Sequence, residues 1–172
     1  VYGVLLHRPQ QLLGPNGGML LRGLQRLKDS GRAEKIGVSV YAPQELSDLH
    51  AHHRFDLIQA PFNIVDRRLQ TSGWLHRLKN DGVEVHVRSV FLQGLLLMAP
   101  SEIPVAFARW SGVWTTWHEW LQHHGLASLD ACLGFVRSVP EIDRVVVGAD
   151  SVAQLREILL AARRDNLMDD PD

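Results

Sequence analysis

Short runs of β-branched and aliphatic residues alternate along this chain with longer segments of helical periodicity. The strand-like runs lie at residues 4–6, 36–38, 56–58, 83–87 and 145–147. The helix-like segments lie at residues 19–29, 43–49, 71–80, 104–137 and 151–163, and the fourth is broken near Gly125. In the last of them we expect Ser151 to be the N-cap and Leu155, Ile158 and Leu159 to share one face. This alternation predicts a parallel sheet whose faces are covered by helices.

The spacing of these units limits the choice of α/β fold. Each strand–helix pair takes roughly 30 residues, the usual length of a βα repeat. A closed (β/α)8 TIM barrel needs about 250 residues, so this chain of 172 residues predicts an incomplete barrel of about five βα units. An open, doubly wound five-stranded sheet would be complete at this length and is the structural alternative. We assign residues 1–164 to the barrel portion and residues 165–172 to an acidic tail.

Polar residues follow every predicted strand. They are His7, Ser39, Gln59, the pair Arg88 and Ser89, and the segment 148–151. Because the carboxyl ends of parallel strands meet at one rim, and barrels hold their ligands there, we expect a binding site at this rim. The glycine at the start of the last segment allows close approach of a ligand, and the helix that follows favours an anion such as a nucleotide phosphate.

Five segments carry a family resemblance, in the same order as in the family. Residues 5–9 (LLHRP), 36–39 (IGVS), 57–63 (LIQAPFN), 88–96 (RSVFLQGLL) and 147–151 (VGADS) resemble segments of the aldo-keto reductases. The resemblance implies a (β/α)8 barrel and an NAD(P)H-dependent oxidoreductase that reduces a small-molecule carbonyl to an alcohol. It implies NADP or NAD as the cofactor, with NADP the more common choice in the family.

The resemblance also implies roles for single residues. His7, the catalytic residue, would polarise or orient the substrate carbonyl, and Ser39 and Gln59 would hold the nicotinamide carboxamide. Arg88 stands where the family often stacks a tyrosine on the nicotinamide. The other implied cofactor-binding residues are Ser89, Phe91 and Gln93 at the pyrophosphate, and Gly148, Asp150, Ser151 and Gln154 at the adenosine end.

Three positions depart from the family. Val40 replaces an asparagine that contacts the carboxamide, and Arg88 replaces the aromatic residue that stacks on the ring. Gln154 stands where a basic residue often binds the 2′-phosphate of NADP, so the choice between NADP and NAD stays open.

The family's tyrosine proton donor, lysine and aspartate lie upstream of the histidine in its sequences. Tyr2 and Tyr41 are the chain's two tyrosines. We expect Tyr2 to point into the first strand, and Tyr41 stands where the family has an ordinary loop residue, so neither replaces the donor. General acid catalysis contributes about 10²–10⁴-fold to a rate. We therefore expect the chain to be a truncated, inactive form unless a partner chain completes the barrel. The alternative function is a non-catalytic nucleotide-binding protein or subunit that kept the cofactor site.

Composition restricts the partners and the compartment. A formal net charge of -1 provides no field that would attract nucleic acid or a membrane surface, and no apolar run is long enough to cross a bilayer. The single cysteine, Cys132, has no partner for an internal disulfide and lies in an apolar helical stretch, so we expect a buried thiol and a cytoplasmic protein.

Two further groups of residues have structural interpretations. The histidines at positions 50, 52, 53, 123 and 124 fit solvated helix ends better than a metal site. Four tryptophans, at positions 110, 114, 117 and 120, share one helical face. We expect this face to pack in the core; the alternative is that part of it borders the substrate pocket.

Overall fold

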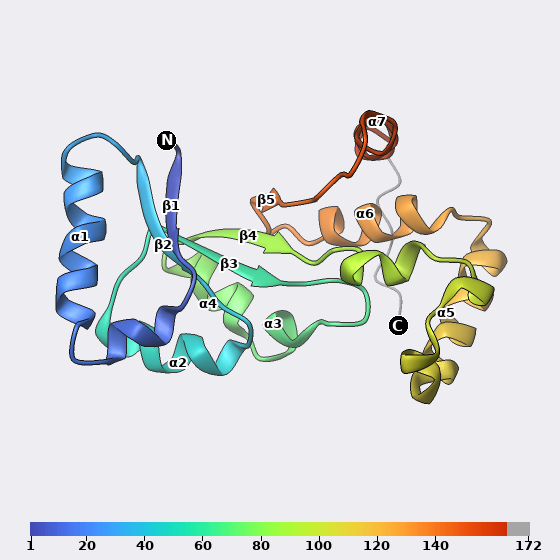
Figure 1. Cartoon of the computed structure of the whole chain (residues 1–172), viewed down its shortest axis with the longest axis horizontal. Helices are drawn as coiled ribbons and strands as arrows, with labels where there is room; N and C mark the ends of the chain where they lie inside the picture. The colour runs from blue at the N-terminus through green and yellow to red at the C-terminus, as the bar shows by residue number, and fades with distance from the viewer. Residues whose placement is uncertain (165–172) are drawn as a thin grey trace. The chain divides into compact units, whose positions relative to one another are not determined.

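The computed structural model describes residues 1–164, so the predicted tail at residues 165–172 lies outside the described part of the chain. Two compact units make up the structure. The first consists of Val1–Arg88 with Pro140–Val146, and the second consists of Ser89–Val139 with the segment that begins at Val147. Figure 1 shows the elements of both units, which are described separately below.

The first unit contains a parallel sheet. Its strands are β1 (Gly3–Leu6), β2 (Lys35–Ser39), β3 (Leu57–Pro61), β4 (Glu84–Arg88) and β5 (Arg144–Val145), paired side by side in sequence order. This confirms the predicted five parallel strands. The last strand is shorter than the predicted 145–147: the ladder ends at Val145, although the Val146 N–H still donates to the Val87 carbonyl at 2.8 Å.

Helices connect these strands and cover one side of them in Figure 1. They are η1 (Pro9–Leu13), α1 (Gly17–Asp29), α2 (Pro43–His52), α3 (Arg68–Thr71) and α4 (Trp74–Asn80). The single helix predicted over residues 71–80 is two helices, because Gly73 adopts a left-handed conformation with φ 79° and interrupts the hydrogen-bonding pattern. The short η1 was not predicted, since its five residues are too few to show a period.

Alternating side chains give the sheet two different faces. Val38, Val40, Val85 and Val87 lie on one face, and each is fully buried. The opposite face carries polar residues towards both ends of the strands. Gly37 on this face lies so close to β3 that an added Cβ would collide with the backbone carbonyl of Leu57, so only glycine allows these two strands to pair as they do.

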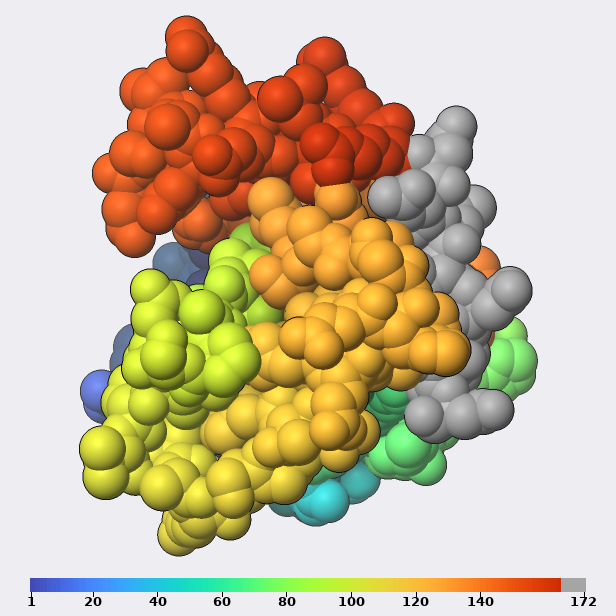
Figure 2. Space-filling model, turned by 90° about the vertical axis from the view of Figure 1, so that its right-hand side faces the viewer, coloured from blue at the N-terminus to red at the C-terminus, as the bar shows by residue number. Residues whose placement is uncertain are grey.

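The second unit is helical. It contains η2 (Leu92–Leu97), η3 (Pro100–Glu102), η4 (Val105–Trp110), α5 (Ser111–His124), α6 (Ser128–Ser138) and α7 (Val152–Ala161). In Figure 2, α6 (orange) lies beside the yellow-green segment that includes η2. The predicted break near Gly125 is confirmed: this residue is left-handed, with φ 62°, and ends α5.

An ion pair joins α6 to the segment after α7. Arg164 Nη1 lies 2.5 Å from Asp130 Oδ2, and Arg137 of α6 donates to the Arg164 carbonyl at 2.8 Å.

Cys132, also on α6, is buried, which confirms the predicted buried thiol. This burial raises the pKa of the thiol to about 12.

The face predicted for α7 is only partly buried. Leu155, Ile158 and Leu159 share the expected face, but Leu155 is 45% exposed and Leu159 is 49% exposed, whereas Ile158 is buried. Periodicity shows which residues share a face, and burial also needs a surface to pack against. The described part of the second unit supplies such a surface for Ile158 but not for the other two.

One carboxylate joins β2, β4 and β5 of the first unit to Tyr2, which directly precedes β1. Glu84, at the start of β4, has a side chain that is 9% exposed. Its Oε2 accepts from the Tyr2 hydroxyl at 2.5 Å and from Lys35 Nζ. Its Oε1 lies 2.7 Å from His86 Nε2 and accepts from Arg144 Nε at 2.9 Å. Tyr2 therefore does not simply point into its strand as expected, because its hydroxyl binds a charged cluster that we call the Glu84 cluster.

The same contacts determine the charge of Glu84. Burial acts to raise the pKa of this carboxyl, but the hydrogen bonds from Lys35, Tyr2, His86 and Arg144 outweigh it and hold the pKa well below its ordinary value of 4.5. A carboxyl whose pKa is lowered by folding stabilises the native state above its unfolded pKa, and this contribution is lost as the pH falls.

We predict that Glu84→Gln lowers the free energy of unfolding by about 2 kcal/mol at pH 7. This is less than the ~3–5 kcal/mol typical of a broken buried pair, because Lys35 and Arg144 are partly exposed. The difference from wild type should shrink as the pH falls below 4.5. Urea unfolding between pH 7 and 3 measures both effects, with the exposed Glu34→Gln as control. A constant difference across this range would contradict the assigned role.

Candidate active site

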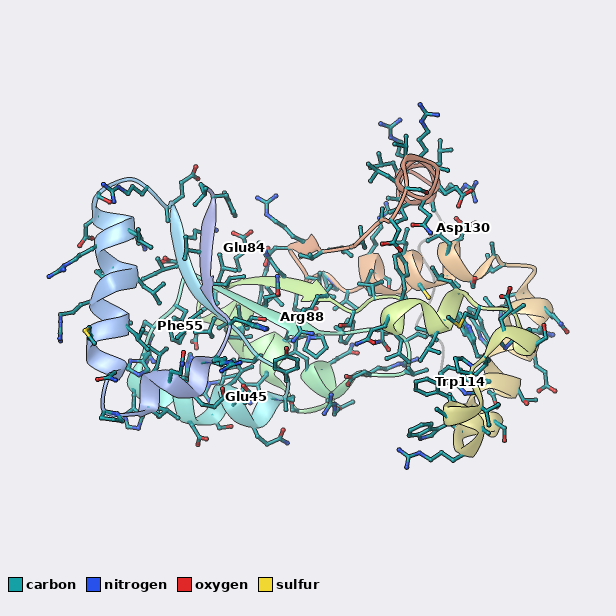
Figure 3. The ribbon with its side chains drawn as sticks, viewed as in Figure 1. Glu45, Phe55, Glu84, Arg88, Trp114 and Asp130 are labelled. Atoms are coloured by element: carbon teal, nitrogen blue, oxygen red, sulfur yellow. The ribbon has the colours of Figure 1, made fainter. Side chains whose placement is uncertain are left out.

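The carboxyl ends of the strands place several predicted site residues on one face. Strand register pairs Ser39 of β2 with Gln59 of β3, and Pro61 of β3 with Arg88 of β4. Since side chains alternate along a strand, Ser39, Gln59 and Arg88 share the face of the sheet that also carries the Glu84 cluster. Figure 3 labels Glu84 and Arg88, which begin and end β4.

Ser39 and Gln59 form a hydrogen-bonded pair at this rim. Ser39 Oγ donates to Gln59 Oε1 at 3.2 Å, and Ser39 is buried whereas Gln59 is partly exposed. The amide of Gln59 has two N–H donors besides the oxygen that accepts from Ser39. A donor–acceptor pair of this kind matches the hydrogen-bonding groups of a primary carboxamide.

His7 follows β1 and is exposed. Its ring lies 5.9 Å from the ring of Tyr41, measured between centroids. An accessible imidazole can donate a hydrogen bond to a carbonyl oxygen. The described structure thus puts His7 near the end of β2, where Ser39 also lies.

Arg88 makes contacts that the sequence did not reveal. Its Nη2 donates to the Val40 carbonyl at 3.1 Å, and its Cζ lies 4.4 Å from the centre of the Tyr41 ring. Both partners follow β2, so the Arg88 side chain reaches from the end of β4 across β3. Tyr41 was expected to be an ordinary loop residue, and its contact with Arg88 was not predicted.

In the second unit, an unusual backbone segment contains Ser89, Phe91 and Gln93. Ser89, Leu92 and Gln93 have positive φ angles of 60°, 47° and 56°, and Gly94 has φ 91°. Non-glycine residues seldom adopt this conformation, and where they do so in a cluster the site is often functional. Consecutive residues of this kind can also direct their backbone N–H groups towards an anion.

The other predicted binding segment of the second unit begins α7. Ser151 caps the helix, since its Oγ accepts from the Gln154 N–H at 3.1 Å. The Gln154 side chain accepts in turn from the Asp150 N–H at 2.7 Å. Gly148, Asp150, Ser151 and Gln154 are all exposed. The predicted cap is therefore confirmed, and Gln154 also stabilises the start of the helix.

The tryptophan face predicted for residues 110–120 is only partly in the core. Trp114 and Trp117 are buried, and their Nε1 atoms donate to the carbonyls of Phe107 and Leu96, whereas Trp110 is exposed. Trp114, labelled in Figure 3, also borders a hollow of about 470 Å³ within the second unit. Apolar residues of the segment 100–108 line the rest of this hollow, together with the polar side of α5.

Among residues 1–164, no cluster of histidine, cysteine and acidic side chains could hold a metal ion. The histidines near the end of α2 are not all solvated as expected: His50 Nε2 lies 2.8 Å from Asp81 Oδ2, and its side chain is 11% exposed. No helix in this part of the chain is long and apolar enough to cross a membrane.

Comparison with known proteins identifies the family. The model of the aldo/keto reductase family matches residues 4–170. The chain belongs to this family. No curated protein sequence matches it.

Solved aldo-keto reductases share the fold. AKR11C1 from Bacillus halodurans, in its holo form, is 19% identical with a TM-score of 0.64, over 83% of this chain and 49% of that one. The thermostable aldo-keto reductase Tm1743, solved with the inhibitor epalrestat, is 21% identical with a TM-score of 0.67, over 97% of this chain and 57% of that one. The aldo/keto reductase chain described here thus spans about half the length of these relatives.

We predict that Ser151→Ala destabilises α7 by about 1 kcal/mol, the usual cost of losing an N-cap. The amide hydrogen of Gln154 should then exchange faster with solvent, which hydrogen exchange measured by NMR will show. Ser151→Asp supplies another acceptor at the cap and should leave the exchange rate near that of wild type. Equal exchange in wild type and Ser151→Ala would contradict the capping role.

Proposed function

We propose that the protein is an NAD(P)H-dependent oxidoreductase that reduces the carbonyl of a small molecule to an alcohol. The observation that carries this proposal is the rim of the first unit, where Ser39 and Gln59 form a hydrogen-bonded pair close to the end of the strand that His7 follows. Membership of the aldo/keto reductase family supports the class of reaction.

We infer from the family resemblance which residues of each unit would bind a nicotinamide dinucleotide. In this proposal Ser39 and Gln59 bind the carboxamide, and the left-handed segment with Ser89, Phe91 and Gln93 binds the pyrophosphate. Gly148, Asp150, Ser151 and Gln154 bind the adenosine end, where the N-terminus of α7 favours an anion. The bound cofactor supplies the hydride, and the protein supplies orientation and electrostatics.

His7 is the residue that we assign to the substrate. Its exposed imidazole would donate a hydrogen bond to the substrate carbonyl, which polarises that bond and orients the carbon for attack. The hydroxyl of Tyr2 is bonded to Glu84, so Tyr2 is not available as the proton donor for the product alcohol.

Both NADP and NAD remain candidates for the cofactor. The family favours NADP, whereas Gln154 is uncharged and hydrogen-bonded at the start of α7.

We also propose that strands from outside the described residues pair with the free edge of β1, in the same chain or in a partner chain. An edge strand leaves backbone groups unpaired, and the solved relatives are about twice as long as this chain. A cytoplasmic location fits the single buried cysteine.

We predict that NADPH or NADH raises the melting temperature of the chain and quenches its tryptophan fluorescence. A ligand at 100 times its Kd adds about 2.7 kcal/mol of stability to the native state. Comparing the two dinucleotides in one titration series decides between NADP and NAD.

The matched variants are Gln59→Ala and Gln25→Ala. Loss of the carboxamide contact should weaken dinucleotide binding about fivefold, since a good hydrogen bond contributes ~1 kcal/mol and each 1.4 kcal/mol changes an affinity about tenfold. Gln25 is an exposed glutamine of α1 bonded to Asp29, and its replacement should leave affinity unchanged. Wild-type affinity for the dinucleotide in Gln59→Ala would contradict the proposed carboxamide contact. Binding without turnover of any aldehyde or ketone would support the non-catalytic alternative.

A further inference from the structure

Tyr41 lies at the centre of the candidate site although it belongs to none of the motifs. It follows Ser39 by two positions, so it lies on the same side of the sheet as Ser39 and Gln59. Its ring packs against the Arg88 guanidinium, with 4.4 Å from Cζ to the ring centre, and lies 5.9 Å from the ring of His7. It is nevertheless 53% exposed, so part of this aromatic ring is open to a ligand.

The backbone of Tyr41 is held by a carboxylate of α2. Glu45 Oε1 accepts from the N–H groups of Tyr41 at 2.9 Å and Ala42 at 3.1 Å. Its Oε2 accepts from Gln10 Nε2 at 2.5 Å, which joins the loop after β2 to η1. Figure 3 labels Glu45 together with Arg88. These bonds hold the loop in place, and a ring on a fixed loop loses little conformational freedom on binding.

The side chain of Tyr41 is held from the other side by Arg88. Arg88 bonds to the carbonyl of Val40, the residue before Tyr41, and its planar guanidinium packs on the ring. The family commonly has an aromatic side chain at the position of Arg88. In this chain that position holds a cation that packs on Tyr41, and Phe62, the aromatic residue just after β3, is 0% exposed. The accessible aromatic ring next to the Ser39–Gln59 pair is therefore that of Tyr41.

We propose that Tyr41 supplies the aromatic surface on which the nicotinamide ring of the cofactor packs, and that Arg88 is a positioning residue that holds the Tyr41 ring. The inference rests on the proposed function, since it concerns the same cofactor. Flat rings attract one another in offset stacks, and this contact needs no hydroxyl. The aromatic contact of the site thus comes from the loop after β2 instead of from the end of β4.

The test separates the nicotinamide end of the cofactor from the rest. Calorimetry measures the affinity of the chain for NADPH and for 2′-phospho-ADP-ribose, which lacks the nicotinamide; NADH and ADP-ribose form the second pair. Tyr41→Leu should weaken binding of the full dinucleotide about tenfold and leave the affinity for the fragment unchanged. Tyr41→Phe keeps the ring and should bind both ligands as wild type does.

Two further variants extend the test. Arg88→Leu should weaken the dinucleotide less than Tyr41→Leu does, because it releases the ring without removing it. Trp110→Leu removes a partly exposed aromatic residue from the second unit and should change neither affinity. If Tyr41→Leu proves too unstable to purify, Tyr41→His takes its place, with a smaller ring and an expected intermediate loss.

The outcomes are distinguishable. Wild-type affinity for the dinucleotide in Tyr41→Leu would overturn the inference. So would an equal loss for the fragment, since that result means a purely structural role. Failure of the wild-type chain to bind either the dinucleotide or the fragment would overturn the proposed function and the inference together.

Discussion

The Glu84 carboxylate is the contact on which the sheet most depends. It accepts hydrogen bonds from residues of β2, β4 and β5 and from Tyr2 just before β1, so one buried negative charge connects four neighbouring parts of the sheet. Lys35, Arg144 and His86 surround the Glu84 carboxylate, so its negative charge is paired. A charge with little exposure to solvent needs such partners, because an unpaired one would destabilise the fold. The cluster lies towards the amino ends of the strands, and the candidate site lies at their carboxyl ends on the same face. The stabilising contacts of Glu84 and the proposed binding residues therefore lie at opposite ends of the strands, as is usual in α/β barrels.

The candidate site of the first unit takes its side chains from the strands and from the positions just beyond them. Ser39 and Gln59 are held in the sheet by strand pairing, whereas His7 and Tyr41 lie just beyond the strand ends. Arg88 connects the end of β4 to the loop after β2 through contacts with Val40 and Tyr41. In the second unit, the left-handed segment 89–94 and the capped start of α7 are the segments that we propose for the pyrophosphate and the adenosine end.

The sequence predicted most of the strands and helices and the residues of the candidate site, but not the contacts between distant residues. The five parallel strands, the helix break at Gly125 and the cap at Ser151 follow from local patterns, and all were predicted from them. The split of the helix at Gly73, the short η1 and the exposed leucines of α7 were missed, because they depend on backbone angles or on packing partners. The contacts of Glu84 with Tyr2, Lys35 and Arg144, and the contact of Arg88 with Tyr41, join residues more than 40 positions apart. No periodicity in a single sequence reports such pairs. The motifs identified the residues at the rim, and the structure adds which of them touch.

Gly37 has a consequence for how the sequence can change over time. Any side chain at this position would collide with the Leu57 carbonyl and push β2 away from β3. The next register pair along these two strands is Val38 with Ile58, and the one after it is Ser39 with Gln59. A substitution of Gly37, which is not among the proposed binding residues, would therefore separate the two side chains proposed to hold the carboxamide. Selection on binding should thus keep position 37 free of side chains as strictly as it keeps the binding residues themselves.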